Sequence, residues 1–70
     1  MDEVYRGYRI AIRQTDKFEA RVTHVRGPYV PLNATATLAE GEDRCVARAR
    51  ELIDRYVKFL EQNGLSSEPN

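Results

Sequence analysis

The sequence predicts an α+β fold in which one C-terminal α-helix packs on one face of a three-stranded antiparallel β-meander, in the order β-β-β-α. The stretch from Glu42 to Gln62 gathers its apolar residues on one side of a helix. The chain before it alternates apolar and polar residues, as half-buried strands do. The helix has to bury its apolar side, and we expect the upstream sheet to receive it.

The helix from Glu42 to Gln62 has an apolar arc roughly 160° wide. Its members are Cys45, Val46, Ala49, Leu52, Ile53, Tyr56, Val57, Phe59 and Leu60. Two starts compete, because Thr37 and Glu40 have capping-box spacing while Gly41 precedes two acidic residues. We predict Gly41 as the N-cap, since a glycine inside the first turn costs about 1 kcal/mol.

Two strands are predicted before residue 27. Val4 to Arg13 has strand composition, and Gly7 inside it indicates a bulge or a close approach of another backbone. Lys17 to Arg26 alternates in the same way after a short turn at Thr15-Asp16. That connection is too short for a parallel crossover, so the two strands should pair as an antiparallel hairpin.

The third predicted strand is Tyr29 to Leu38, after a turn at Gly27-Pro28. Pro31 has no N–H to give to a neighbouring strand, so this strand belongs at an edge of the sheet. The expected strand order is therefore 1-2-3, with the second strand in the centre.

Length and composition limit the class of protein. The chain has 70 residues, which predicts one domain over residues 1–64, and its polar end predicts a disordered tail over 65–70. The net charge is zero, and the single cysteine excludes an internal disulfide. No apolar run is long enough for a membrane span, and the acidic N-terminus has no signal core. We expect a soluble cytoplasmic protein without a membrane partner.

The residue types that most often act in catalysis, histidine and cysteine, do not form a recognisable catalytic arrangement in this sequence. His24 has no partner at a recognisable spacing, and Cys45 lies in the middle of the apolar arc of the helix. The sequence holds no phosphate-binding loop, dinucleotide fingerprint or serine elbow. We therefore expect no enzyme, no cofactor and no metal site.

Charge is unevenly placed along the chain. Val4 to Arg26 holds six basic residues against two acidic ones, a local charge of +4. Strand parity puts Arg9, Arg13, Lys17 and Arg21 on the face that the helix leaves uncovered, together with Tyr5, Glu19, Asn33, Thr35 and Thr37. Such a surface suits phosphates and base edges, although any exposed sheet face needs polar residues.

A second candidate surface lies near the end of the helix, at Tyr56, Phe59 and Leu60. The apolar arc is broader than a three-stranded sheet normally covers, and Phe59 lies at one margin of it. Either this strip is buried against a second copy of the chain, or Phe59 closes the open end of the core.

Three short motifs carry a resemblance. They are Tyr5-Arg6-Gly7, Phe18-Glu19-Ala20-Arg21-Val22 and Ile53-Asp54-Arg55. At this spacing the chain resembles a group of small uncharacterised bacterial domains. That resemblance implies the β-β-β-α fold and no established activity.

The Tyr5-Arg6-Gly7 start and the aromatic-x-Ala-x-aliphatic strand are also similar to the plant ethylene-response-factor type of DNA-binding domain. In that family, as in transposon integrase N-terminal domains, the sheet enters the major groove, and the resemblance implies DNA contacts for Arg6 and Arg9. Ala11 and Thr23 stand where that family has arginines. The element order further resembles part of the HicB-type antitoxins.

These observations support two functional hypotheses. The first is a small non-catalytic module that binds a protein partner or a second copy of itself. The alternative is binding of duplex DNA through the basic face of the sheet, by Arg6, Arg9, Arg13, Lys17 and Arg21.

Overall fold

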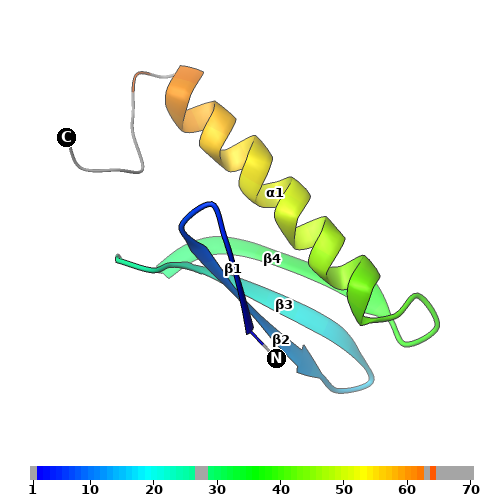
Figure 1. The fold of residues 1–70 in the computed structure, drawn as a ribbon. Coiled ribbons are helices and arrows are strands. Elements are labelled where there is room, and N and C mark those ends of the chain that lie inside the picture. Colours follow the sequence, from blue (N-terminus) through cyan, green and yellow to red (C-terminus); the bar gives the residue numbers. More distant parts are fainter. Residues whose placement is uncertain (1, 27–28, 63, 65–70) are drawn as a thin grey trace.

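The computed structural model describes residues 2–26, 29–62 and 64, and it shows an antiparallel sheet with a helix across one face (Figure 1). The elements are β1 (Asp2–Tyr5), β2 (Tyr8–Gln14), β3 (Lys17–His24), β4 (Tyr29–Thr37) and α1 (Glu42–Gln62). The strand order is β1-β2-β3-β4, so each strand pairs with the next one along the chain. The α+β class with a C-terminal helix is confirmed, but the predicted count of three strands is wrong, because the sheet has four.

The additional strand arises from a tight turn at Arg6-Gly7. Both residues have positive φ, 53° for Arg6 and 84° for Gly7, as the two central residues of a type I′ hairpin turn require. The predicted continuous strand from Val4 to Arg13 is therefore two strands, and Gly7 makes a turn rather than a bulge. This turn could not be predicted from the sequence, because arginine rarely adopts positive φ. An Asn-Gly or Asp-Gly pair at the same place would have indicated it.

The turn also changes the face on which Tyr5 lies. Tyr5 is directly opposite Tyr8, whose side chain is buried under α1. The Tyr5 hydroxyl donates to the Asp54 carboxylate on the helix at 3.0 Å. The prediction that Tyr5 lies on the uncovered face is therefore wrong, since strand parity does not carry through a two-residue reversal.

The core lies between the sheet and α1. Its fully buried members Ile10, Val22 and Ile53 come from β2, β3 and the helix, and each is 0% exposed. β4 lies at an edge of the sheet, as Pro31 predicts. The predicted turn at Gly27-Pro28 and the predicted disordered tail, 65–70, lie outside the described residues.

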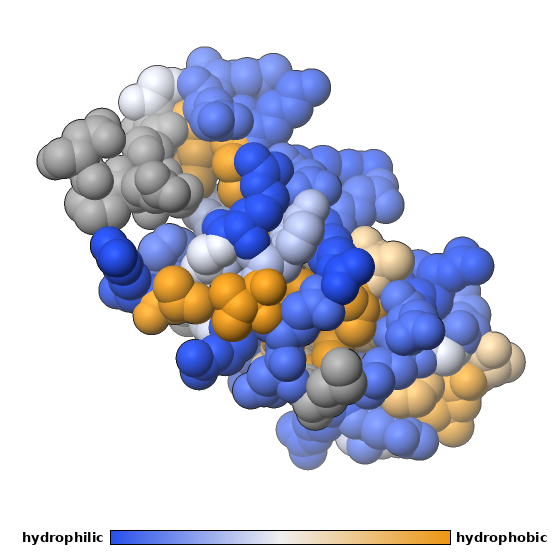
Figure 2. Space-filling model, in the orientation of Figure 1, coloured by the Kyte–Doolittle hydropathy of each residue, from blue (hydrophilic) through white to orange (hydrophobic). Residues whose placement is uncertain are grey.

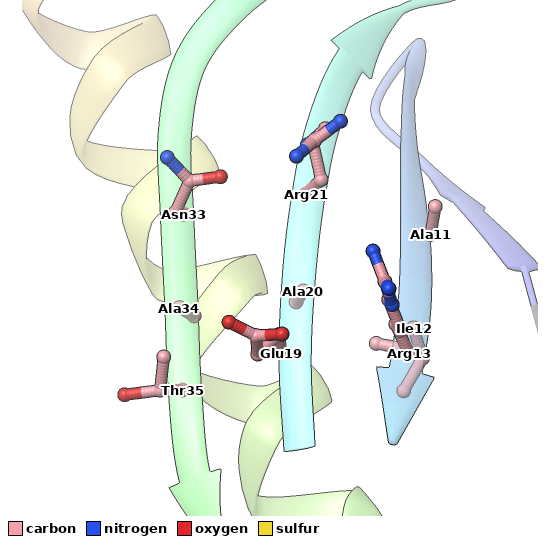
Figure 3. A pocket seen from close by; sticks show the side chains of 9 residues that line it. All are labelled: Ala11, Ile12, Arg13, Glu19, Ala20, Arg21, Asn33, Ala34 and Thr35. Atoms are coloured by element: carbon pink, nitrogen blue, oxygen red, sulfur yellow. The ribbon is translucent and has the colours of Figure 1, made fainter. Parts of the chain in front are cut away.

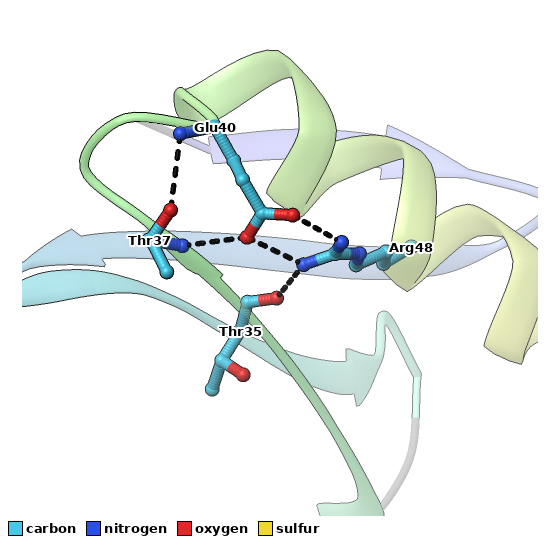
Figure 4. Close-up of polar contacts among 4 residues, drawn as sticks. All are labelled: Thr35, Thr37, Glu40 and Arg48. Carbon is cyan, nitrogen blue, oxygen red and sulfur yellow. Dashed lines mark hydrogen bonds and ion pairs between the residues drawn. The ribbon is translucent and has the colours of Figure 1, made fainter.

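α1 starts after Gly41, as predicted, and the Thr37–Glu40 pair of the alternative start forms hydrogen bonds just before it. Gly41 has φ +92°, and its carbonyl accepts from the Cys45 N–H at 3.4 Å, which makes Gly41 the N-cap. Just before it, the Thr37 N–H donates to the Glu40 carboxylate at 2.9 Å and the Glu40 N–H donates to the Thr37 hydroxyl at 3.1 Å (Figure 4). Arg48 joins this pair to β4 by donating to Glu40 and to the Thr35 carbonyl, the latter at 2.9 Å.

Most of the predicted apolar arc of α1 is covered. Cys45, Val46, Ala49, Ile53 and Val57 are buried, and the outward surface of the helix is mostly hydrophilic (Figure 2). α1 runs obliquely across the sheet, with its C-terminal end on the side of the β1–β2 turn (Figure 1). No helix in the described part of the chain combines the length and the apolar character that a membrane crossing demands.

Candidate functional site

The face of the sheet turned away from α1, called here the open face, carries the basic side chains that parity predicts. Arg9 and Arg13 come from β2, and Lys17 and Arg21 come from β3; all four are exposed. The register places Arg21 directly opposite Ala11, which lies between Arg9 and Arg13 in the same row of β2. Arg21 is thus a diagonal neighbour of both arginines, about 7–8 Å away between Cα atoms.

The arginines of the open face differ from those that contact α1. The ion pairs of the described residues join Arg6 to Asp54, Arg48 to Glu40, Arg50 to Glu3 and Arg55 to Glu51. Each of these pairs includes a residue of α1. Within the described part of the chain, Arg9, Arg13 and Arg21 take part in no ion pair, so their guanidinium groups remain available to a ligand.

Arg6 does not belong with these residues. It lies in the β1–β2 turn, and its guanidinium donates to Asp54 at 2.9 Å. The hydrogen bonds from Arg6 and Tyr5 lower the pKa of the Asp54 carboxyl, and the bond to Asp54 raises the pKa of Tyr5. The structure therefore separates Arg6 from the other four predicted basic residues and gives it the role of fastening β1 to the helix.

A shallow hollow of about 450 Å³ lies in the middle of the open face (Figure 3). It exists because Ala11 has a short side chain in a row between two arginines. Its lining residues with long polar side chains are Arg13, Glu19, Arg21 and Asn33. This hollow is not among the surfaces predicted from the sequence, although the row Arg9-x-Ala11-x-Arg13, with its one short side chain, indicates it.

Two carboxylates moderate the charge of the open face. Glu19 lies directly opposite Arg13, and Asp2 lies directly opposite Ala11. Four basic side chains against these two acidic ones leave the face positive. The open face has few large apolar side chains. Among the described side chains of the four strands, the one on this face is Val4, at the β1 edge, which is 60% exposed. The open face is thus suited to ligands that are anionic and rich in hydrogen-bonding groups.

His24 and Cys45, the two residues considered for catalysis, are both packed against other residues of the fold. His24 is half-buried, with its ring edge-on to Tyr8 at 5.0 Å between centroids, and its Nδ1 accepts from the Arg26 N–H at 3.1 Å. Cys45 is 0% exposed, and burial raises the pKa of its thiol. Among the described residues, no group of three His, Cys, Asp or Glu side chains is placed to hold a metal ion.

The second predicted surface is only partly exposed. Tyr56 is half-buried, and its ring stands edge-on to that of Tyr8 at 6.2 Å between centroids. Leu60 is also half-buried, whereas Phe59 is 54% exposed. Tyr56 therefore contributes to the core, and Phe59 is the residue of the three that faces outward.

Comparison with known proteins adds no family to this description. The chain matches no protein-family model, and no curated protein or solved structure matches it. The resemblances to uncharacterised bacterial domains, to ethylene-response-factor and integrase N-terminal domains and to HicB-type antitoxins therefore gain no support, and no residue role is carried over from them.

Proposed function

We propose that this protein is a non-catalytic module that binds duplex nucleic acid through the open face of its sheet. One observation carries the proposal. Arg6, Arg48, Arg50 and Arg55 are held by carboxylates in pairs that include a residue of α1, whereas Arg9, Arg13 and Arg21 share one face and enter none of the ion pairs of the described residues. Clustered guanidinium groups repel one another, and a bound polyanion relieves that repulsion.

The chemistry of the open face favours nucleic acid over a protein partner. Protein interfaces combine arginine with large aromatic or apolar side chains that are buried on binding, and among the described side chains of the open face Val4 at the sheet edge is the one large apolar side chain. Protein–DNA interfaces are instead polar and positively charged. Arg9, Arg13, Lys17 and Arg21 are the residue types that bind phosphates, and Asn33 and Thr35 beside them add hydrogen-bonding groups.

The dimensions of the β2–β3 ribbon agree with this function. All four basic residues lie on these two strands, which are about 4.8 Å apart. The major groove of B-DNA is about 12 Å wide, so side chains from these two central strands of the sheet can enter it together. α1 lies on the opposite side of the sheet, so it leaves the approach to the groove open (Figure 3).

Fluorescence anisotropy with a labelled mixed-sequence duplex of 16 base pairs tests the proposal. Each basic residue that contacts a phosphate adds about −0.9 to the slope of the logarithm of the binding constant against the logarithm of salt concentration, so four such contacts give at most about −3.6. A slope of that size weakens binding about 150-fold between 50 and 200 mM salt. The double variant Arg9→Ala with Lys17→Ala should reduce the magnitude of the slope by about 1.8.

Arg44→Ala is the matched control, because Arg44 is exposed on α1 and enters none of the ion pairs of the described residues. It removes one positive charge from the other side of the molecule and should leave the slope unchanged. Absence of binding at 20 mM salt, or equal effects of Arg44→Ala and Arg9→Ala, would refute the proposal.

Self-association through the end of α1 is a second candidate function. Phe59 is 54% exposed, and an aromatic side chain of this exposure is a typical interface anchor. Light scattering at concentrations up to 1 mM should then detect a dimer that Phe59→Ser abolishes. A strict monomer over the whole range would remove this candidate without affecting the first.

A further inference from the structure

The centre of the open face differs in chemistry from its ends. Arg21 lies directly opposite Asn33, and Glu19 lies directly opposite Thr35. These side chains extend over the hollow from neighbouring strands (Figure 3). A guanidinium offers donors alone, a carboxylate offers acceptors alone and a carboxamide offers both. The hollow is therefore surrounded by a mixed set of hydrogen-bonding groups rather than by uniform positive charge.

Glu19 argues against a phosphate group in the hollow. Its carboxylate lies on β3 directly opposite Arg13 and two residues from Arg21. A negative charge in that position repels an incoming phosphate. The edges of base pairs in the major groove, by contrast, present donors as well as acceptors. The centre of the face is thus better matched to base edges than to the backbone of a duplex.

The cations beyond the hollow are placed to reach phosphates. Arg9 is opposite Thr23, which lies six residues along β3 from Lys17. At about 3.3 Å per residue, Arg9 and Lys17 are about 20 Å apart along the ribbon. This separation exceeds the major-groove width of about 12 Å, so the two side chains reach both walls of the groove while the hollow lies over the bases.

We propose that Glu19, Arg21 and Asn33 read base edges in the major groove, while Arg9 and Lys17 hold phosphates on its two walls. This inference rests on the proposed nucleic-acid function. An arginine fork pairs with O6 and N7 of guanine, an asparagine with N6 and N7 of adenine, and a glutamate accepts from N4 of cytosine. Because Arg21 and Asn33 are direct neighbours across two strands, the preferred duplex holds a G·C pair close to an A·T pair.

Selection from a duplex pool with twelve randomised base pairs, followed by sequencing, tests this assignment. The wild-type protein should enrich a motif with guanine and adenine at fixed separation. Arg21→Lys keeps the charge but loses the fork, so it should lose the guanine preference. Asn33→Ala should lose the adenine preference, and each variant should reduce discrimination at its own position roughly tenfold.

Two matched variants separate reading from general binding. Lys17→Ala should leave the motif unchanged, weaken binding to every duplex and lower the salt slope by about 0.9. Gln14 is an exposed residue directly opposite Phe18, so its side chain lies on the α1 side of the sheet. Gln14→Ala should therefore leave the motif, the affinity and the salt slope unchanged. Circular dichroism confirms that each variant is folded.

The failures are distinguishable. If the wild-type protein binds the pool without enriching a motif, or if Arg21→Lys and Asn33→Ala keep the wild-type motif, base reading is refuted while nucleic-acid binding stands. If the wild-type protein binds no duplex at 20 mM salt, the proposed function is refuted together with the inference.

Discussion

Truncation of Ile53 should destabilise the whole domain, because this side chain joins the helix to the sheet. Ile53 is 0% exposed and belongs to the buried cluster that also contains Ile10 and Val22. Replacing a fully buried isoleucine by alanine costs about 2–5 kcal/mol. A chain of 70 residues has a free energy of unfolding of about 3.5–10 kcal/mol. Ile53→Ala should therefore remove about a fifth of the stability or more.

Urea unfolding followed by far-UV circular dichroism measures this loss, since the chain has no tryptophan to report by fluorescence. The midpoint should fall while the dependence on urea stays the same, and Tm should fall by about 4–8 °C for each kcal/mol. Ile53→Val should cost only about 0.5–1.5 kcal/mol. Lys58→Ala, on the exposed side of the same helix, should stay within about 0.5 kcal/mol. A loss below about 1 kcal/mol for Ile53→Ala, or separate transitions for helix and sheet, would refute the packing described here.

Three further predictions concern the turn, the helix start and the buried thiol. Gly7→Ala should lower the free energy of unfolding by about 1–2 kcal/mol, because Gly7 has φ +84°. The cost is conformational, since a Cβ at this position would meet no atom within 4 Å. A variant as stable as the wild type in urea would contradict the left-handed turn. Hydrogen bonds from Arg48 and from the Thr37 N–H lower the pKa of Glu40 from 4.5 to about 2. The folded state thus favours the carboxylate, and the stability that Glu40 contributes is complete above pH 4.5 and lost as the pH falls toward 2. Glu40→Gln should abolish this part of the acid dependence, and an unchanged pH profile would contradict the assignment. Cys45, 0% exposed and with a raised thiol pKa, should react with a thiol reagent only as urea unfolds the protein, and rapid labelling in buffer would contradict its burial.

The helix and the long strands could be predicted because their signals are repeated many times. The helix has the predicted bounds, Glu42–Gln62, since its apolar arc covers several turns and Gly41 marks its start. Strand parity placed Ile10 and Val22 in the core, where both are 0% exposed. Each of these predictions uses many residues with the same period, so one exceptional residue does not change it.

The β1–β2 hairpin could not be predicted because one residue decides it. Arg6 adopts φ 53°, and its ion pair with Asp54 joins residues far apart in the chain. Nothing local to Arg6-Gly7 reports this contact. The turn placed Tyr5 on the helix side, and the ion pair with Asp54 took Arg6 out of the basic face. Arg9, Arg13, Lys17 and Arg21 stayed where parity placed them.

Titration of the ¹⁵N-labelled protein with a short duplex at low salt, followed by NMR, identifies the face of the protein that the duplex contacts. The proposed binding surface is the open face of the sheet. The amide signals of β2 and β3 around Arg9, Ala11 and Arg21 should shift in proportion to bound duplex, while those of the outward surface of α1, such as Arg55, should stay unchanged. Shifts concentrated on α1, or no shifts at all, would refute binding through the open face.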